Sequence, residues 1–201
     1  MISKQMQAQV ESSSVIRAMF EEGKRLASVY GADNVFDFSL GNPSVEPPAE
    51  IKTALLDILQ EKNSAGIHGY MNNSGFESVR DAIAQSLNRR FHTNFSQNNI
   101  IMTVGAAGGL NVIFKTLLDP QDEVIVFAPF FGEYRNYVSN YQGKLIVIPA
   151  DTASFQPNLA MLQEMITAQT KAVIVNSPNN PTGVVYSSAT IHQLADILRN
   201  K

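Results

Sequence analysis

Residues 171–183 read KAVIVNSPNNPTG, and this stretch decides the fold class. Its first part, Lys171 to Val175, is a short β-branched run that is typical of a buried strand. Its second part holds three asparagines, two prolines and a glycine, which are poor choices for stability alone. In open α/β sheets, ligands bind at the carboxyl ends of the strands. The stretch therefore predicts a strand that ends in a ligand-binding loop.

Strand and helix patterns alternate along the chain from residue 99 onward. Such alternation is typical of crossover units and a mainly parallel sheet. Several of the strands are apolar on both faces, as a sheet covered by helices requires. The strands are expected at 99–104, 123–127, 144–148 and 171–176, and the helices at 106–118, 131–140, 157–168 and 188–199. We therefore expect an α/β fold, a three-layer sandwich with a mainly parallel sheet.

An N-terminal helical segment is expected before this sheet. A helix over residues 12–30 should stop at Gly31, and a second helix should open at Pro47-Pro48. A third helix is expected over residues 74–91, and its first four residues, Ser-Gly-Phe-Glu, match a capping box. The buried side of this third helix is expected to carry Val79, Ile83 and Leu87.

Composition excludes several classes of function. The chain has 201 residues, is 44% apolar and carries a net charge of −3, and it has no basic run, so binding to nucleic acid is not expected. It has no cysteine, which excludes disulfides and thiolate metal sites, and its three histidines lie far apart, so no metal site is expected. No signal peptide and no long apolar run are present, so we expect a cytoplasmic protein without a membrane partner.

A small-residue loop joins the first expected strand to its helix. Gly105, Ala106 and Ala107 let an anion approach the backbone, and the start of a helix offers free amides with a partial positive charge. The loop therefore favours a phosphate, although a tight turn with close helix–sheet packing is the alternative. The glycines do not have the G-x-G-x-x-G spacing of a dinucleotide site, and no acidic residue follows the next strand, which disfavours a nicotinamide-dependent enzyme.

Two later loops offer an aromatic ring and an amide. Phe130-Phe131 follows the strand at 123–127, and an aromatic there can stack on a flat ring, unless both rings belong to the core. Asn180 can donate a hydrogen bond to a phenolate oxygen, unless its segment is a plain turn.

These segments together resemble the fold-type I, class I/II aminotransferases, which use pyridoxal 5′-phosphate. Residues 180–183 match the N-P-T-G signature of that family, and residues 129–134 match its P-x-[aromatic]-x-x-Y segment. Residues 38–43 resemble the family's x-L-G-x-P segment, and Tyr70 begins a Y-x4-G-x4-R segment. The resemblance covers residues 12–200 with the motifs in family order.

The resemblance implies roles for residues of the three strand-end loops. Gly105, Ala106 and Ala107 would hold the cofactor phosphate, Phe131 would cover one face of the pyridine ring, and Asn180 would donate to the phenolate oxygen.

It also implies roles for two upstream residues. Gly41 would lie beside the substrate carboxylate, and Tyr70 would reach the phosphate of the neighbouring subunit's cofactor. The implied protein is a homodimer that moves an amino group between an amino acid and a 2-oxo acid.

The catalytic lysine of the family is missing. Relatives carry it in an S-x-[SA]-K context, and none of the eight lysines here has that context, so no catalytic residue is expected in this chain. We therefore expect the N-terminal portion of an aminotransferase, with residues 1–47 as an arm of the small domain and 48–201 as an incomplete large domain. Two alternatives stay open: an inert fragment that binds pyridoxal phosphate or phosphate, and another fold-type I enzyme such as a C–S lyase or a synthase.

Overall fold

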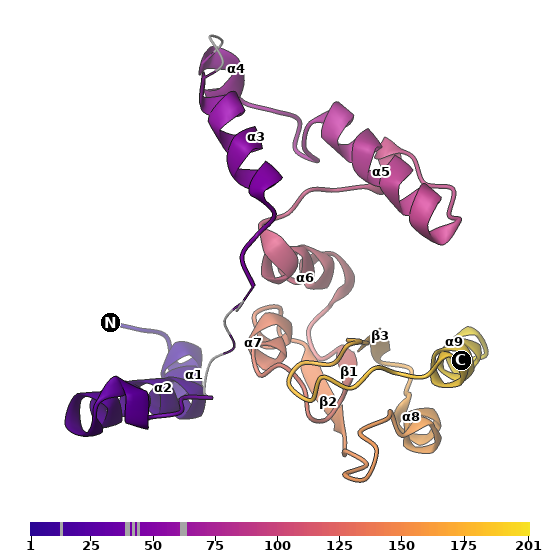
Figure 1. The fold of residues 1–201 in the computed structure, drawn as a ribbon. Helices are drawn as coiled ribbons and strands as arrows, with labels where there is room; N and C mark the ends of the chain where they lie inside the picture. The colour runs from indigo at the N-terminus through magenta and orange to yellow at the C-terminus, as the bar shows by residue number, and fades with distance from the viewer. Residues whose placement is uncertain (13, 39–40, 42, 44, 61–63) are drawn as a thin grey trace. The chain divides into compact units, whose positions relative to one another are not determined.

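The computed structural model describes residues 1–12, 14–38, 41, 43, 45–60 and 64–201. The chain forms two compact units, Met1–Met71 and Asn72–Lys201. In the described residues the first unit is helical, and the second holds a sheet and its helices (Figure 1). The expected division at residue 47 concerns the domains of the whole protein and stays a prediction.

The helices of the first unit largely follow the sequence pattern. The expected helix over 12–30 is observed as α2 (Ser14–Tyr30), and it stops at Gly31, whose φ of 86° favours glycine. The helix expected after Pro47-Pro48 is observed as α3 (Ala49–Gln60). The other elements are α1 (Lys4–Ser12), η1 (Ala32–Asn34) and α4 (Ser64–His68).

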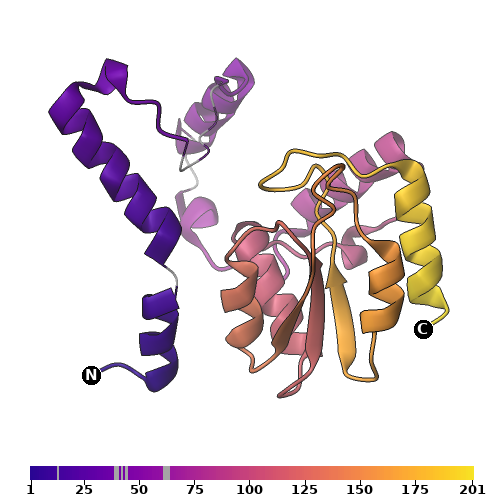
Figure 2. The same cartoon turned by 90° about the horizontal axis from the view of Figure 1, so that it is seen from below.

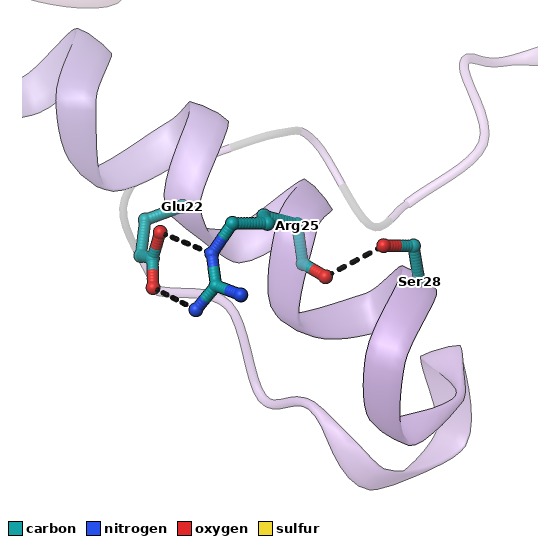
Figure 3. Close-up of polar contacts among 3 residues, drawn as sticks. All are labelled: Glu22, Arg25 and Ser28. Atoms are coloured by element: carbon teal, nitrogen blue, oxygen red, sulfur yellow. Dashed lines mark hydrogen bonds and ion pairs between the residues drawn. The ribbon is translucent and has the colours of Figure 1, made fainter.

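An ion pair lies on the surface of α2 (Figure 3). Nε and one terminal nitrogen of Arg25 donate to the Glu22 carboxylate at 2.8 and 2.7 Å. These hydrogen bonds lower the pKa of Glu22 and raise that of Arg25. Both side chains are exposed, so the pair contributes little to stability.

The first helix of the second unit differs from the prediction. Helix α5 (Glu77–Phe91) begins after Phe76 without a side-chain cap, so the predicted capping box is wrong. The Ser74 carbonyl instead accepts a hydrogen bond from the Met102 amide. The buried residues of α5 are Arg80 and Ala84, whereas Val79 is exposed and Ile83 and Leu87 are half-buried.

The sheet has three parallel strands. They are β1 (Glu123–Phe127), β2 (Lys144–Ile148) and β3 (Thr170–Ile174), in the order β2-β1-β3. Ile125 is paired with Ile146 on one side and Val173 on the other. The strand expected at 99–104 is wrong, because η2 (Gln97–Asn99) opens this stretch and no strand is assigned to residues 100–104.

Helices cover both faces of the sheet (Figure 2). Helices α6 (Gly105–Leu117) and α7 (Tyr134–Ser139) pack on one face, where Phe114, Val124 and Val138 form a buried cluster. Helices α8 (Leu159–Met165) and α9 (Ser188–Arg199) cover the other face, where the buried cluster is Ile125, Phe127, Ile148, Leu162 and Leu194. Alternate residues of β1 thus pack on opposite faces of the sheet. The predicted three-layer α/β sandwich is confirmed.

None of the helices in the described ranges has the length and apolar character that a membrane crossing needs. The cytoplasmic location stays a prediction.

Candidate functional site

Two of the predicted loops begin at the same edge of the sheet. All strands are parallel, so their carboxyl ends lie at the same edge. Phe131 follows the end of β1, and Asn180 follows the end of β3 in the long loop that is yellow in Figure 2. The sequence therefore brings the aromatic ring and the amide to the same edge.

The start of α6 points to this edge as well. The helix ends at Leu117, shortly before β1 begins, and Phe114 packs it against the sheet, so α6 runs opposite to the strands. Leu110, one turn nearer the helix start, and Ile174, the last residue of β3, pack against the same cluster. Gly105 therefore lies toward the carboxyl ends of the strands.

The first turn of α6 has free hydrogen-bond donors. Gly105 has a φ of 63°, and a side chain built on it would meet no atom within 4 Å. The amides of Gly105 and Gly108 donate to the carbonyls of Thr103 and Val104, whereas those of Ala106 and Ala107 have no partner among the described residues. Free amides at the positive end of a helix dipole are suited to an anion.

The aromatic segment after β1 leaves one ring open to solvent. Phe131 is 36% exposed, and its ring stands nearly perpendicular to that of Tyr134, with 5.7 Å between their centroids. Tyr134 is half-buried, and burial, with the neighbouring Tyr137, raises its pKa. Phe131 therefore offers an apolar surface to a flat ring, and the neutral Tyr134 packs against Phe131.

The loop after β3 leaves one asparagine side chain free. The backbone amide of Asn180 donates to Oδ1 of Asn176 at 2.8 Å. The side chain of Asn180 is exposed and has no partner among the residues that the structure describes. A free carboxamide can donate to an anionic oxygen and accept from an N–H group.

Sequence reasoning missed two buried polar residues beside this loop. Asn179 is 7% exposed and Tyr186 is 6% exposed, and the Asn179 amide nitrogen donates to the Tyr186 hydroxyl at 3.5 Å. Burial raises the pKa of Tyr186, the hydrogen bond from Asn179 lowers it, and the nearby Tyr134 raises it. No local signal predicts that Asn179 is buried and Asn180 exposed, because both lie in the same polar run.

The lysines of the second unit lie away from this edge. Lys144 and Lys171 are at the amino-terminal ends of β2 and β3, and Lys115 is in the last turn of α6. Lys201 follows the C-terminal end of α9, which runs back from the loop after β3. No lysine of this unit therefore stands where a ligand at the strand ends could reach it.

Tyr70 and Gly41 belong to the first unit. Tyr70 is fully exposed, and Gly41 is exposed with no atom within 4 Å of a side chain built on it. Ser39, Leu40 and Asn42, which share the Gly41 motif, lie outside the described residues. The roles of Tyr70 and Gly41 stay predictions.

Two cavities of the second unit lie away from these loops. One of about 470 Å³ lies between α8 and α9, and one of about 390 Å³ lies beside β3. Neither of these two cavities is lined by Gly105, Phe131 or Asn180. In the described ranges, no three His, Asp or Glu side chains gather as metal ligands would.

The residues at the strand ends fit the parts of pyridoxal phosphate. The Ala106 and Ala107 amides suit a phosphate, the exposed part of Phe131 suits an aromatic ring, and the Asn180 amide suits a phenolate oxygen. The arrangement can bind and orient such a group, and the second unit provides no lysine amine there for a covalent bond.

Comparisons with known proteins point to a single family. Residues 33–201 match the family described as aminotransferase class I and II. The chain is 30% identical to the aspartate aminotransferase of Thermotoga maritima over 93% of its length, and 32% identical to the aspartate/prephenate aminotransferase of Thermus thermophilus over 96%. A solved aminotransferase from Eubacterium rectale superposes on the whole chain with a TM-score of 0.93 and 41% identity. The chain spans 49% of each of these two relatives and 51% of that solved chain, about half their length.

Proposed function

This chain belongs to the aminotransferase class I and II family, and from that membership we propose that the whole protein moves an amino group between an amino acid and a 2-oxo acid with pyridoxal 5′-phosphate. The observation that carries the proposal is the set of free donors and the exposed ring at the carboxyl edge of the sheet. The cofactor supplies an electron sink for the bond changes at the amino acid.

The residues of this chain bind and orient the cofactor. The amides of Ala106 and Ala107, at the start of α6, hold the phosphate. Phe131 covers one face of the ring and keeps water from it, and Asn180 donates to the phenolate oxygen. Gly41 lies beside the substrate carboxylate in the proposed enzyme.

Binding of pyridoxamine 5′-phosphate tests this assignment directly, because this ligand has the phosphate, ring and phenolate oxygen but needs no lysine. We expect the chain to bind it in a calorimetric titration and to bind pyridoxamine, which lacks the phosphate, at least tenfold more weakly. Equal affinity for the two ligands would contradict a phosphate site at α6.

A Gly105→Val substitution should weaken this binding about tenfold. A β-branched residue is strongly disfavoured at a φ of 63°, so the loop must rearrange and move the Ala106 and Ala107 amides. Gly132→Ala is the matched control, since its added side chain meets no atom within 4 Å and its φ is not positive. Unchanged affinity in Gly105→Val would count against the loop as the phosphate site.

For the 201-residue chain itself, we propose cofactor binding without turnover. The lysines of the second unit are at the opposite edge from the site, which favours an inert binding role for the chain alone. Chain mixed with pyridoxal phosphate, glutamate and oxaloacetate should form no aspartate above the rate of a cofactor-only blank. Borohydride reduction followed by peptide mass analysis should find no site-specific lysine adduct, and a single modified lysine would refute the proposal.

The whole protein is further proposed to be a homodimer. The fully exposed ring of Tyr70 supports this, because such a side chain is free to reach a second copy. In this proposal Tyr70 contacts the cofactor phosphate of the neighbouring subunit, and residues 1–47 contribute to the small domain while 48–201 belong to the large domain.

A further inference from the structure

The loop between β3 and α9 holds three asparagines in different environments. Asn176 accepts the Asn180 backbone amide through Oδ1, and Asn179 is buried. Asn180 is exposed, and its side chain has no partner in the described part of the chain. The side chains of Asn176 and Asn179 thus take part in the structure of the loop, and the side chain of Asn180 is available to a ligand.

Asn179 closes the loop around Asn180 and Pro181. Its backbone amide donates to the Val184 carbonyl at 2.9 Å, and its carbonyl accepts from the Gly183 amide at 2.7 Å. Its Oδ1 accepts from the Thr182 amide at 3.3 Å and from the Thr182 hydroxyl at 2.9 Å. These bonds join the residue before Asn180 to the three that follow Pro181, so the tip of the loop is held from both sides.

Tyr186 holds the other end of the Asn179 side chain. Its hydroxyl accepts from Nδ2 of Asn179, and its own backbone amide donates to the Ser177 hydroxyl at 2.9 Å. Tyr134 is near enough to raise the pKa of Tyr186, and the Tyr134 ring packs against Phe131. The Asn179 side chain is therefore held at both its oxygen and its nitrogen.

We propose that Asn179 and Tyr186 are positioning residues that orient the Asn180 side chain toward the phenolate oxygen of the cofactor. This inference rests on the proposed function. Neither residue needs to touch the ligand, because the Asn179 carboxamide is occupied by Thr182 and Tyr186. A donor held in place before binding loses little conformational entropy when the ligand arrives.

The test compares two ligands that differ only at the phenolate oxygen, pyridoxamine 5′-phosphate and its 3-O-methyl derivative. The wild-type chain should bind the first ligand about tenfold more tightly than the second, so the ratio of the two affinities should be about ten. This is the effect of one hydrogen bond to a charged group. Asn180→Ala should reduce this ratio to about one. Asn179→Ala should reduce it to about twofold, and Tyr186→Phe should reduce it by a smaller factor, because the bond it removes is long.

Asn158→Ala is the matched control. Asn158 caps α8 by accepting from the Met161 amide at 3.0 Å, so this variant also loses an asparagine hydrogen bond but leaves the loop after β3 intact. It should keep the wild-type ratio. A merely structural effect of Asn179→Ala would weaken both ligands equally and leave the ratio unchanged, and that result would overturn the inference.

Two failures are distinguishable. A wild-type ratio of one would overturn the proposed role of Asn180 and this inference with it. A ratio lost in Asn180→Ala but kept in Asn179→Ala would overturn the inference alone.

Hydrogen exchange measured by NMR without ligand gives a second readout. In Asn179→Ala the Thr182 amide should exchange about fivefold faster, because its acceptor is gone, while Val126 in β1 should be unchanged. Unaltered exchange at Thr182 would show that Asn179 does not hold the loop and would also overturn the inference.

Discussion

An Arg80→Met variant is expected to lower the free energy of unfolding of the second unit by about 3 kcal/mol. Arg80 is 6% exposed, and its Nε donates to the Gly75 carbonyl at 3.1 Å. One terminal nitrogen donates to the Gln97 carbonyl at 2.6 Å and approaches the Ile100 carbonyl at 3.5 Å. Methionine fills similar space but donates no hydrogen bond. These carbonyls therefore lose a charged donor at a place where water has little access to replace it.

Urea denaturation followed by circular dichroism measures this loss, and Arg89→Met is its control. Arg89 lies on the same helix with an exposed side chain, so its replacement should change the free energy of unfolding by less than about 0.5 kcal/mol. Equal effects of the two substitutions would contradict the structural role of Arg80. Arg80→Lys should recover only part of the loss, because an ammonium group lacks the planar fork that reaches two carbonyls.

The sheet and its covering helices were predictable from local sequence. The strands 123–127 and 144–148 are observed with the predicted bounds, because long apolar runs can be buried only between two helix layers. The helix at 188–199 has its predicted bounds too, since Ser187 caps its start by accepting from the Thr190 amide.

The expected strand at 99–104 shows where local sequence stops being sufficient. The backbone amides and carbonyls of a strand need hydrogen-bond partners on an adjacent strand. The sequence of the strand itself does not show whether such a partner strand is present. Here the Ile100 amide donates to Gln97, the Met102 amide donates to Ser74, and the Ile100 carbonyl faces Arg80. The backbone groups that would pair with an adjacent strand are therefore hydrogen-bonded within turns or to the Arg80 side chain.

The candidate site was predictable in part for a similar reason. The resemblance to the family's motifs identified Gly105, Phe131 and Asn180, and their loops lie toward the carboxyl ends of the strands. The supporting role of Asn179 depends on bonds to Thr182, Gly183 and Val184, which the loop makes only when it closes. Tyr186, likewise, is a supporting residue only because Asn179 donates to its hydroxyl in the fold.

A Gly75→Ala variant is expected to lower the free energy of unfolding of the second unit by about 4 kcal/mol. Gly75 is buried with a φ of 99°, a conformation that residues with a side chain rarely adopt. A Cβ at this position would lie 2.5 Å from Cγ and 2.9 Å from Cβ of Met102. Backbone strain and overpacking therefore add in one substitution, and urea denaturation against the Gly132→Ala control measures their sum.

Met102 separates the two causes of this loss. In the double variant Gly75→Ala with Met102→Ala, the Cγ contact is gone, but the backbone strain and the contact at 2.9 Å remain. We expect about half of the lost free energy of unfolding to return, because Met102 is 42% exposed and its own truncation costs little. Full recovery would assign the whole loss to the methionine side chain and remove backbone strain as a cause. No recovery would assign the loss to the backbone strain at Gly75 and to the contact with the Met102 Cβ, both of which the double variant keeps.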